Sequence, residues 1–219
     1  MTTPRAEQTR GRIVDAALRL FRSSGYDRTT MRSIASEAGV SLGNAYYYFA
    51  SKEHLVQAFY DQIQVEHAAA AEAVLAGETG FDRRLLGVLH AWLDVATPHH
   101  EFAGQFVKNA ADPRSPLSPF SPESAPARET SLALFARVVD GSDAKPVASL
   151  RPQLPQLLWL LQLGVVLFWV YDDSPHQERS RQLVAGTVPV VDRMVKLSRM
   201  PVVRGLVDDV VGLLTTLKR

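Results

Sequence analysis

The sequence contains no cysteine, which excludes disulfide bonds, thiolate metal sites and a catalytic thiol. It also lacks an uninterrupted apolar stretch of the length that crosses a membrane. A transmembrane helix needs about 20 mostly apolar residues, whereas the most apolar run, residues 154–171, contains Pro155, Gln156 and Gln162. The first ten residues have no apolar core, so we expect no secretion signal, no membrane partner and a cytoplasmic protein.

Motifs that carry catalysis are also missing. The sequence has no G-x-S-x-G, no P-loop, no H-E-x-x-H and no glycine-rich dinucleotide motif. His99 and His100 suggest a metal pair, but neighbouring helical side chains diverge and Gly104 offers no ligand one turn further on. We therefore expect no enzymatic activity, no catalytic residues, no bound metal and no cofactor.

The alternating pattern of β-strands does not occur, and apolar residues instead recur at spacings of three and four, as in amphipathic helices. The pattern predicts an all-α protein, with helices over residues 9–24, 31–38, 42–49, 51–75, 81–96, 99–111, 127–139, 154–171 and 176–200 and a last one from Pro201. The apolar run at 154–171 reads as a helix buried all round, in a core and at a subunit interface. Residues 112–126 hold five Pro and four Ser, which predicts an exposed or mobile loop.

Charge is unevenly spread along a chain whose net charge is only +1. Residues 1–52 contain eight Lys and Arg against four Asp and Glu, whereas residues 53–219 contain sixteen against nineteen. A basic small domain joined to a slightly acidic larger one suits a polyanion at one end only. The charge pattern therefore favours a division into a small basic domain over residues 1–52 and a larger domain over residues 53–219.

The stretch from Thr29 to Lys52 reads as two short helices joined by a tight turn. Apolar residues at positions 31, 34, 35 and 38 form one helical stripe, and Gly39 suits a left-handed cap. Ser41 can then cap the next helix. This is the pattern of a helix-turn-helix, whose second helix enters the major groove of DNA.

Two longer segments in the same quarter of the chain read IVDAALRLFRSSGYDRTTMRSIA and GVSLGNAYYYFASKEHL. They resemble the tetracycline-repressor (TetR) family, with a departure at Ala45, where that family usually has leucine. The resemblance implies a homodimeric, ligand-responsive transcriptional regulator. It also implies a three-helix DNA-binding domain over residues 1–52 and a larger helical ligand-binding and dimerisation domain over residues 53–219. We expect a repressor that is released from a pseudo-palindromic double-stranded DNA operator by a small, largely hydrophobic effector. The alternative is a protein-interaction module that keeps the fold without specific DNA readout.

Ten residues are predicted to contact DNA: Thr29, Thr30, Arg32, Leu42, Gly43, Asn44, Tyr46, Tyr47, Tyr48 and Lys52. Asn44 lies in the first turn of the reading helix and is suited to pair with adenine. Lys52 stands at a helix start, where a cation is unfavourable unless a phosphate lies nearby. Thr29 and Thr30 suit phosphate contact, simple helix capping or both, and Tyr47 suits DNA contact or packing.

The larger domain is expected to hold the effector and the dimer contact. The resemblance implies an effector cavity, for which the candidates are Trp92, Phe102, Phe106, Asn109, Phe135 and Phe168, with the loop 112–126 as a flap over its mouth. A solid aromatic core is an equally good interpretation of these residues. The helices at 154–171 and 177–200 predict a two-fold interface at Trp159, Leu163, Val184, Val188 and Val191.

Overall fold

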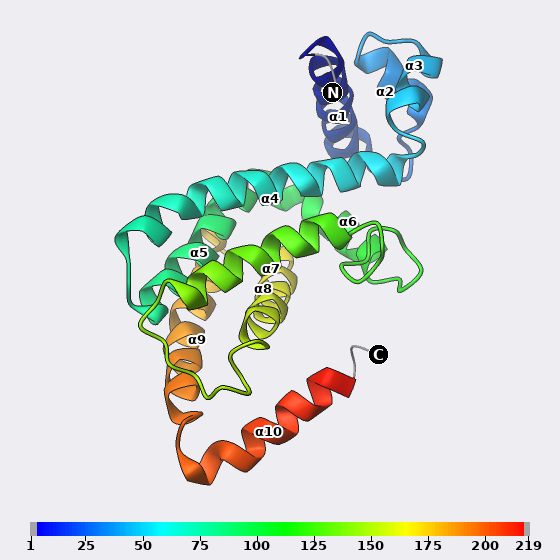
Figure 1. Ribbon diagram of the computed structural model, residues 1–219. Helices are drawn as coiled ribbons and strands as arrows, with labels where there is room; N and C mark the ends of the chain where they lie inside the picture. Colours follow the sequence, from blue (N-terminus) through cyan, green and yellow to red (C-terminus); the bar gives the residue numbers. More distant parts are fainter. Residues whose placement is uncertain (1–3, 217–219) are drawn as a thin grey trace. The chain divides into compact units, whose positions relative to one another are not determined.

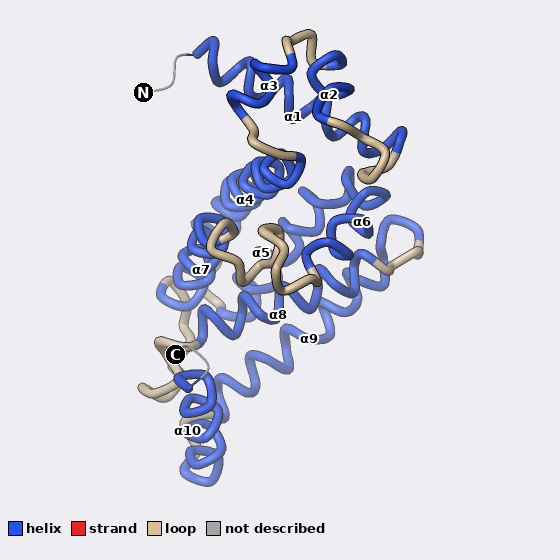
Figure 2. The backbone as a smooth tube through the Cα atoms, turned by 90° about the vertical axis from the view of Figure 1, so that its right-hand side faces the viewer, coloured by secondary structure: helices blue, strands red, loops and turns tan. Residues whose placement is uncertain are grey.

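The computed structural model describes residues 4–216, except the side chains of residues 101, 102, 105, 204, 206, 207, 210, 211 and 213–215. All regular structure in this part of the chain is helical, which confirms the all-α prediction (Figure 2). In chain order (Figure 1) the elements are α1 (Pro4–Ser24), α2 (Met31–Glu37), α3 (Leu42–Tyr48), α4 (Lys52–Gly77), α5 (Phe81–Ala96), the 3₁₀ turn η1 (Thr97–His99), α6 (His100–Ala110), α7 (Ala125–Asp140), α8 (Leu154–Val170), the 3₁₀ turn η2 (Pro175–Gln177), α9 (Glu178–Leu197) and α10 (Pro201–Thr216).

These elements form two compact units. The first unit contains Met1–Ile63 and His99–Ala127, and the second unit contains Gln64–Pro98 and Arg128–Arg219. The predicted boundary at residue 52 coincides with the start of α4, whereas the compact units place the first part of α4, the whole of α6 and the Pro/Ser-rich loop with the three N-terminal helices. The helix α4 therefore contributes to both units.

The short helices of the first unit begin at residues whose side chains cap a helix, and α2 is followed by a glycine in a left-handed conformation. At the start of α2, Thr30 Oγ1 accepts a hydrogen bond from the Ser33 amide, and the Ser33 hydroxyl accepts one from the Thr30 amide, which is a reciprocal capping box. Gly39 follows α2 with φ +67, a left-handed conformation that favours glycine. Ser41 Oγ then accepts a hydrogen bond from the Asn44 amide at 3.1 Å and starts α3.

An aromatic cluster joins α6 to the N-terminal helices within the first unit. The Phe106 ring, 3% exposed, lies 6.4 Å from Phe21 of α1, and 6.1 Å and 5.8 Å from Phe59 and Tyr60 of α4. Burial of a large aromatic side chain is among the larger single contributions to stability. This packing explains why a helix far along the sequence belongs to the same unit as α1.

The Pro/Ser-rich loop is more ordered than the sequence suggested. The amides of Ser115, Ser118 and Ser121 each donate to the carbonyl three residues earlier, so the loop is a succession of turns. Leu117 is 2% exposed, and the Ser124 hydroxyl donates to Gln57 Oε1 of α4 at 3.2 Å. The expectation of an exposed or mobile loop is therefore wrong for its buried residues, because turns of period three can bury one side of a proline-rich segment.

A buried arginine organises one end of the second unit. Arg84, 5% exposed, donates from its guanidinium to the carbonyls of Leu75 and Glu78 near the end of α4, and to those of Arg137 and Val138 near the end of α7. The last carbonyls of a helix have no partner within that helix, and a cation there also favours the helix dipole. Burial, and secondarily the charge of Arg137, lowers the pKa of Arg84.

A buried carboxylate accepts hydrogen bonds from backbone amides and hydroxyls around the start of α9. Asp172, 3% exposed, accepts hydrogen bonds from the amides and hydroxyls of Ser174 and Ser180, at 2.6–3.1 Å. Burial alone would raise the pKa of this carboxyl, but the bonds from Ser174 and Ser180 outweigh it and lower the pKa to about 2. These bonds hold the turn that contains His176 and Gln177, which both have positive φ.

We expect Arg84→Met to destabilise the second unit by about 2–4 kcal/mol, because four helix-terminal carbonyls lose their donor while the apolar stem is kept. Urea unfolding followed by tryptophan fluorescence measures this loss, since all three tryptophans lie buried in the second unit. The neighbouring Arg83 pairs with Glu78 at the surface, so Arg83→Met should cost less than about 1 kcal/mol. Equal losses for the two variants would contradict the role given to Arg84.

Candidate nucleic-acid interface

The helix α3 buries one side and exposes the other. Ala45 is fully buried in the first unit, whereas Asn44 is exposed and Tyr46 and Tyr47 are 50% and 83% exposed. Gly43 is also exposed. The residues predicted to read DNA on this helix therefore lie on its accessible face, with Leu42 and Tyr48 half-buried at its margins.

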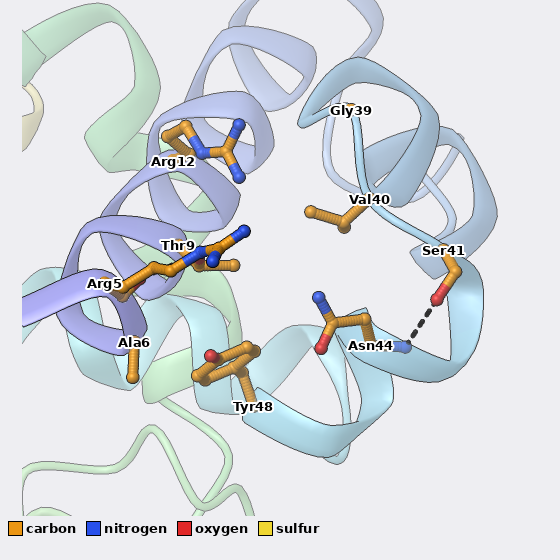
Figure 3. Close-up of a pocket in the computed structure, with 9 residues that line it drawn as sticks. All are labelled: Arg5, Ala6, Thr9, Arg12, Gly39, Val40, Ser41, Asn44 and Tyr48. Carbon is orange, nitrogen blue, oxygen red and sulfur yellow. Dashed lines mark hydrogen bonds between the residues drawn. The ribbon is translucent and has the colours of Figure 1, made fainter. Parts of the chain in front are cut away.

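An open groove of about 480 Å³ runs between α1 and the start of α3. Its lining residues are Arg5, Ala6, Thr9, Arg12, Gly39, Val40, Ser41, Asn44 and Tyr48. Figure 3 shows the guanidinium groups of Arg5 and Arg12 and the amide of Asn44 directed toward the same space. Cationic donors thus stand beside an amide that can both donate and accept hydrogen bonds.

Arg5 was not among the predicted DNA contacts. The predicted first helix began at residue 9, whereas α1 begins at Pro4. Proline suits the first turn of a helix because its missing N–H has no partner there in any case. The extra turn brings Arg5 to the groove, so the signal that would have found it was the proline immediately before it.

Some arginines of the first unit have a side-chain partner, and others have no carboxylate nearby. Arg19 pairs with Glu37 at 3.0 Å, and Arg22 Nη2 donates to His99 Nδ1 at 2.9 Å. Among the described residues no carboxylate lies within ion-pairing distance of Arg5, Arg12 or Arg32, and all three are exposed. These three arginines are therefore suited to meet an external anion.

The two threonines before α2 separate into different roles. Thr29 is 2% exposed, and its hydroxyl donates to the Gly25 carbonyl at 2.8 Å. The prediction that Thr29 contacts a phosphate is therefore wrong in this conformation, because the side chain is buried and its hydroxyl proton is already used. Thr30 is exposed and caps α2, so the capping role is observed and its phosphate contact stays a prediction.

Lys52 has a partner that explains its position at a helix start. Its Nζ donates to the Tyr26 carbonyl at 2.7 Å and lies 4.2 Å from the centre of the Tyr26 ring, a cation–π contact. The Tyr26 hydroxyl in turn donates to Glu53 Oε1 at 2.8 Å. Burial and this bond to Glu53 raise the pKa of Tyr26. The phosphate contact of Lys52 stays a prediction, but an intramolecular explanation now exists for the cation.

The predicted effector residues do not come together in one unit. Trp92 and Phe135 are buried in the second unit, where the Trp92 ring meets Trp169 edge-on at 5.2 Å. Phe106 and the half-buried Asn109 lie in the first unit. Phe168 is 43% exposed and lines an open pocket of about 560 Å³ at the surface of the second unit, so its effector contact stays a prediction. The side chain of Phe102 lies outside the described residues.

The predicted dimer residues also need correction. Trp159, Val184 and Val188 are 5%, 0% and 2% exposed within a single chain, so they belong to the core of the second unit and leave almost no surface for another copy. Leu163 and Val191 are half-buried. The exposed apolar side chains of the same two helices are Leu167, Phe168, Val190, Met194 and Leu197, followed by Tyr171 just after α8.

No helix in the part of the chain that the structure describes is both long enough and apolar enough to span a membrane. No group of three or more His, Cys, Asp or Glu side chains in the same part of the chain could hold a metal ion.

The first unit contains a helix-turn-helix, and the second helix of this motif is exposed beside a basic groove. Together with a larger helical unit, this arrangement is typical of a class of bacterial regulators. Residues 13–59 match the family model described as bacterial regulatory proteins, tetR family. Residues 84–213 match the model described as tetracyclin repressor-like, C-terminal domain. The chain belongs to the TetR family, whose members are regulators and not enzymes.

Curated relatives match over a limited segment. The chain is 42% identical over 72 residues to the HTH-type transcriptional regulator TtgR of Pseudomonas putida, which is 33% of this chain and 34% of TtgR. It is 39% identical over 77 residues to the HTH-type transcriptional repressor KstR of Mycolicibacterium smegmatis, which is 35% of this chain and 38% of KstR. The matched segment thus spans little more than a third of each relative.

Solved structures match over most of the chain. The TetR transcriptional regulator from Nitrosomonas europaea superimposes with a TM-score of 0.62 at 19% identity, covering 87% of this chain and 98% of the other. The multidrug binding protein EbrR, crystallised with imidazole, superimposes with a TM-score of 0.55 at 26% identity, covering 84% and 89%. These similarities extend the fold assignment to both units.

We expect Lys52→Met to weaken the anchoring of α4 to Tyr26 by about 1–2 kcal/mol, because both the hydrogen bond and the cation–π contact are lost. Amide hydrogen exchange in α2 and α3 measures the effect, since these two helices lie in the chain between Tyr26 and Lys52. Lys108 is exposed on α6 of the same unit, so Lys108→Met is the matched control and should leave exchange unchanged. Unchanged exchange in Lys52→Met would contradict this structural role.

Proposed function

We propose that the protein is a ligand-responsive, DNA-binding transcriptional regulator of the cytoplasm that acts as a repressor. The observation that carries the proposal is the groove in which Arg5 and Arg12 of α1 face the exposed Asn44 of α3. A helix of the width of α3 fits the major groove, where an asparagine can recognise adenine through two hydrogen bonds. Arginines at its side suit the phosphates of the adjacent backbone.

The exposed tyrosines of α3 extend the same interface. Tyr47 is 83% exposed and Tyr46 50%, although such rings are usually covered in a folded protein. Tyr47 and Tyr48 contact each other edge-on, with ring centres 5.2 Å apart. Their hydroxyls suit phosphate oxygens and their rings suit the methyl groups of thymine, so DNA supplies both partners that this surface requires.

A second copy of the chain is the proposed partner of α8 and α9. Val190, Met194 and Leu197 follow one another at spacings of four and three, so they form an exposed apolar stripe on α9. Leu167 and Phe168 form a similar exposed patch near the end of α8. Two-fold pairing through these surfaces would present two reading helices to a pseudo-palindromic operator.

Regulation follows from linkage between two binding events. A small molecule that favours a conformation with poorly spaced α3 helices lowers the affinity of the protein for DNA. Bound DNA then lowers the affinity of the protein for the small molecule by the same factor. EbrR, the multidrug binding protein of the same fold, supports a small-molecule effector for this chain. We propose a largely hydrophobic effector in the second unit, where the interior is aromatic and aliphatic.

We expect Arg12→Ala to weaken binding to all DNA sequences alike and to reduce the salt dependence by about one phosphate contact. Asn44→Ala should instead relax the preference at one base pair, at a cost of roughly 1–3 kcal/mol. Sequences selected from random DNA, followed by titrations at several salt concentrations, provide both measurements. Arg151→Ala, at an exposed ion pair in the second unit, is the control and should change neither.

The outcomes separate the proposal from its rival. A protein-interaction module on this fold would select no DNA sequence, and its weak DNA binding would not respond to Asn44→Ala. Retention of full specificity in Asn44→Ala together with loss of specificity in Arg12→Ala would reverse the roles assigned to the two residues.

We expect Met194→Asp to convert the dimer to a monomer, because a charge would replace an apolar side chain at the centre of the proposed stripe. Sedimentation at micromolar concentration measures the change. Val65 is similarly exposed on α4, outside the stripe, so Val65→Asp should remain dimeric. A monomeric wild type, or a dimer that both variants leave intact, would refute the proposed interface.

A further inference from the structure

Arg10 of α1 lies over the ring of Phe49, the residue that ends α3. The guanidinium carbon is 5.1 Å from the centre of the Phe49 ring, which is a cation–π contact. Phe49 is 3% exposed, and its amide donates to the Ala45 carbonyl as the C-cap of α3. A cation thus lies over a buried ring at the C-terminal end of the exposed helix.

The position of Arg10 in the sequence explains this contact. Arg10 precedes the buried Ile13 by three residues and the buried Ala17 by seven, so it stands at the N-terminal end of the core-facing stripe of α1. A charged side chain is unusual on such a stripe. Arg10 itself is exposed, which places it where the core of the first unit meets solvent.

The hydrogen-bond donors of Arg10 are not used within the described part of the chain. No carboxylate there lies within ion-pairing distance of its guanidinium, and no other group accepts a hydrogen bond from it. Arg19 on the same helix shows the contrast, since its Nε donates to Glu37 at 3.0 Å. The N–H groups of a planar guanidinium lie along its edge, so contact with a ring leaves these donors accessible.

This cation is separate from the arginines of the groove. Two residues of an α-helix turn through about 200°, so Arg10 and Arg12 project from different sides of α1. Arg5 and Arg12 line the groove beside Asn44 (Figure 3). Arg10 lies instead at Phe49, where α3 ends. The exposed helix therefore has cations along its groove and another cation at its C-terminal end.

We propose that Arg10 binds a DNA phosphate, and that the Phe49 ring positions it for this contact. The inference rests on the proposed function and adds a residue to its interface, because a helix in the major groove has a phosphate backbone on either side. A guanidinium held on a ring loses less conformational freedom on binding than a mobile side chain, and its planar edge matches the oxygens of a phosphate. This phosphate differs from the one that Arg12 meets, because the two side chains leave α1 on different sides.

The salt dependence of DNA binding tests the contact in the full chain, with the sequence that the protein selects from random DNA. We expect Arg10→Met to reduce the slope of log affinity against log salt by about 0.9, so its deficit relative to wild type shrinks about 3.5-fold over a fourfold rise in salt. The preference among sequences should not change. Arg10→Lys keeps a positive charge at this position and should restore the slope. A purely structural loss would lower affinity without this restoration.

Two further combinations locate the contact. Arg10→Met together with Arg12→Met should lower the slope by about 1.8, because two separate phosphates release their counterions additively. Phe49→Leu keeps an apolar core residue but removes the ring, so Arg10→Met should cost less affinity in that background than in wild type. Arg19→Met removes an ion-paired charge from the same helix and is the matched control, which should leave the slope unchanged.

An unchanged slope in Arg10→Met would overturn the inference, as would a slope that Arg10→Lys fails to restore. A double variant that loses no more than Arg12→Met alone would place both arginines at one phosphate and overturn the assignment of a separate contact. Equal costs of Arg10→Met in the wild-type and Phe49→Leu backgrounds would overturn the positioning by the ring. Circular dichroism of each variant without DNA checks folding, and the slopes of the two single Arg10 variants decide the phosphate contact if Phe49→Leu does not fold.

The proposed function is tested separately, by the base preference of Asn44→Ala. A protein that selects a DNA sequence but keeps its slope in Arg10→Met would lose only the Arg10 contact. A lower slope in Arg10→Met without any sequence preference would leave the phosphate contact and remove the regulator. Absence of all DNA binding would overturn both.

Discussion

The first unit depends on a constraint of length: helices of seven residues, such as α2 and α3, are not stable alone in water. Caps at Thr30 and Ser41 satisfy their first amides, and burial of Ile34 and Ala45 holds one face of each helix. Because the caps and the inner face stabilise α3, Asn44 on its outer face is exposed. This exposure is what allows Asn44 to serve the proposed DNA contact.

In the second unit the buried polar groups are of two kinds. Arg84 and Asp172 are saturated, and both lie at helix ends, where unpaired backbone groups require a partner. His67 and Gln162 lie within helices, where the backbone is already paired, and each keeps one buried side-chain atom without a hydrogen-bond partner. The first kind stabilises the connections between helices.

Much of the fold, and the choice of which face of α3 is exposed, was predictable, because both rest on signals that act within a turn or two. The helix starts at Thr30 and Ser41 and the left-handed Gly39 follow from the chemistry of those residues. The apolar run at 154–171 was correctly read as a helix, but the sequence did not show which of its side chains pack within the same chain. Trp159 was therefore assigned to an interface although it lies in the core.

The sequence by itself determined the family, the all-α class and the outward face of α3, since periodicity, caps and a run of motif residues are local properties. The tertiary structure alone decided which polar groups are paired across helices: Lys52 with Tyr26, Arg84 with the ends of α4 and α7, and His67 with Val88 through one nitrogen only. Such pairings join residues distant in sequence, and they depend on which helix faces meet. No spacing within a single helix encodes that.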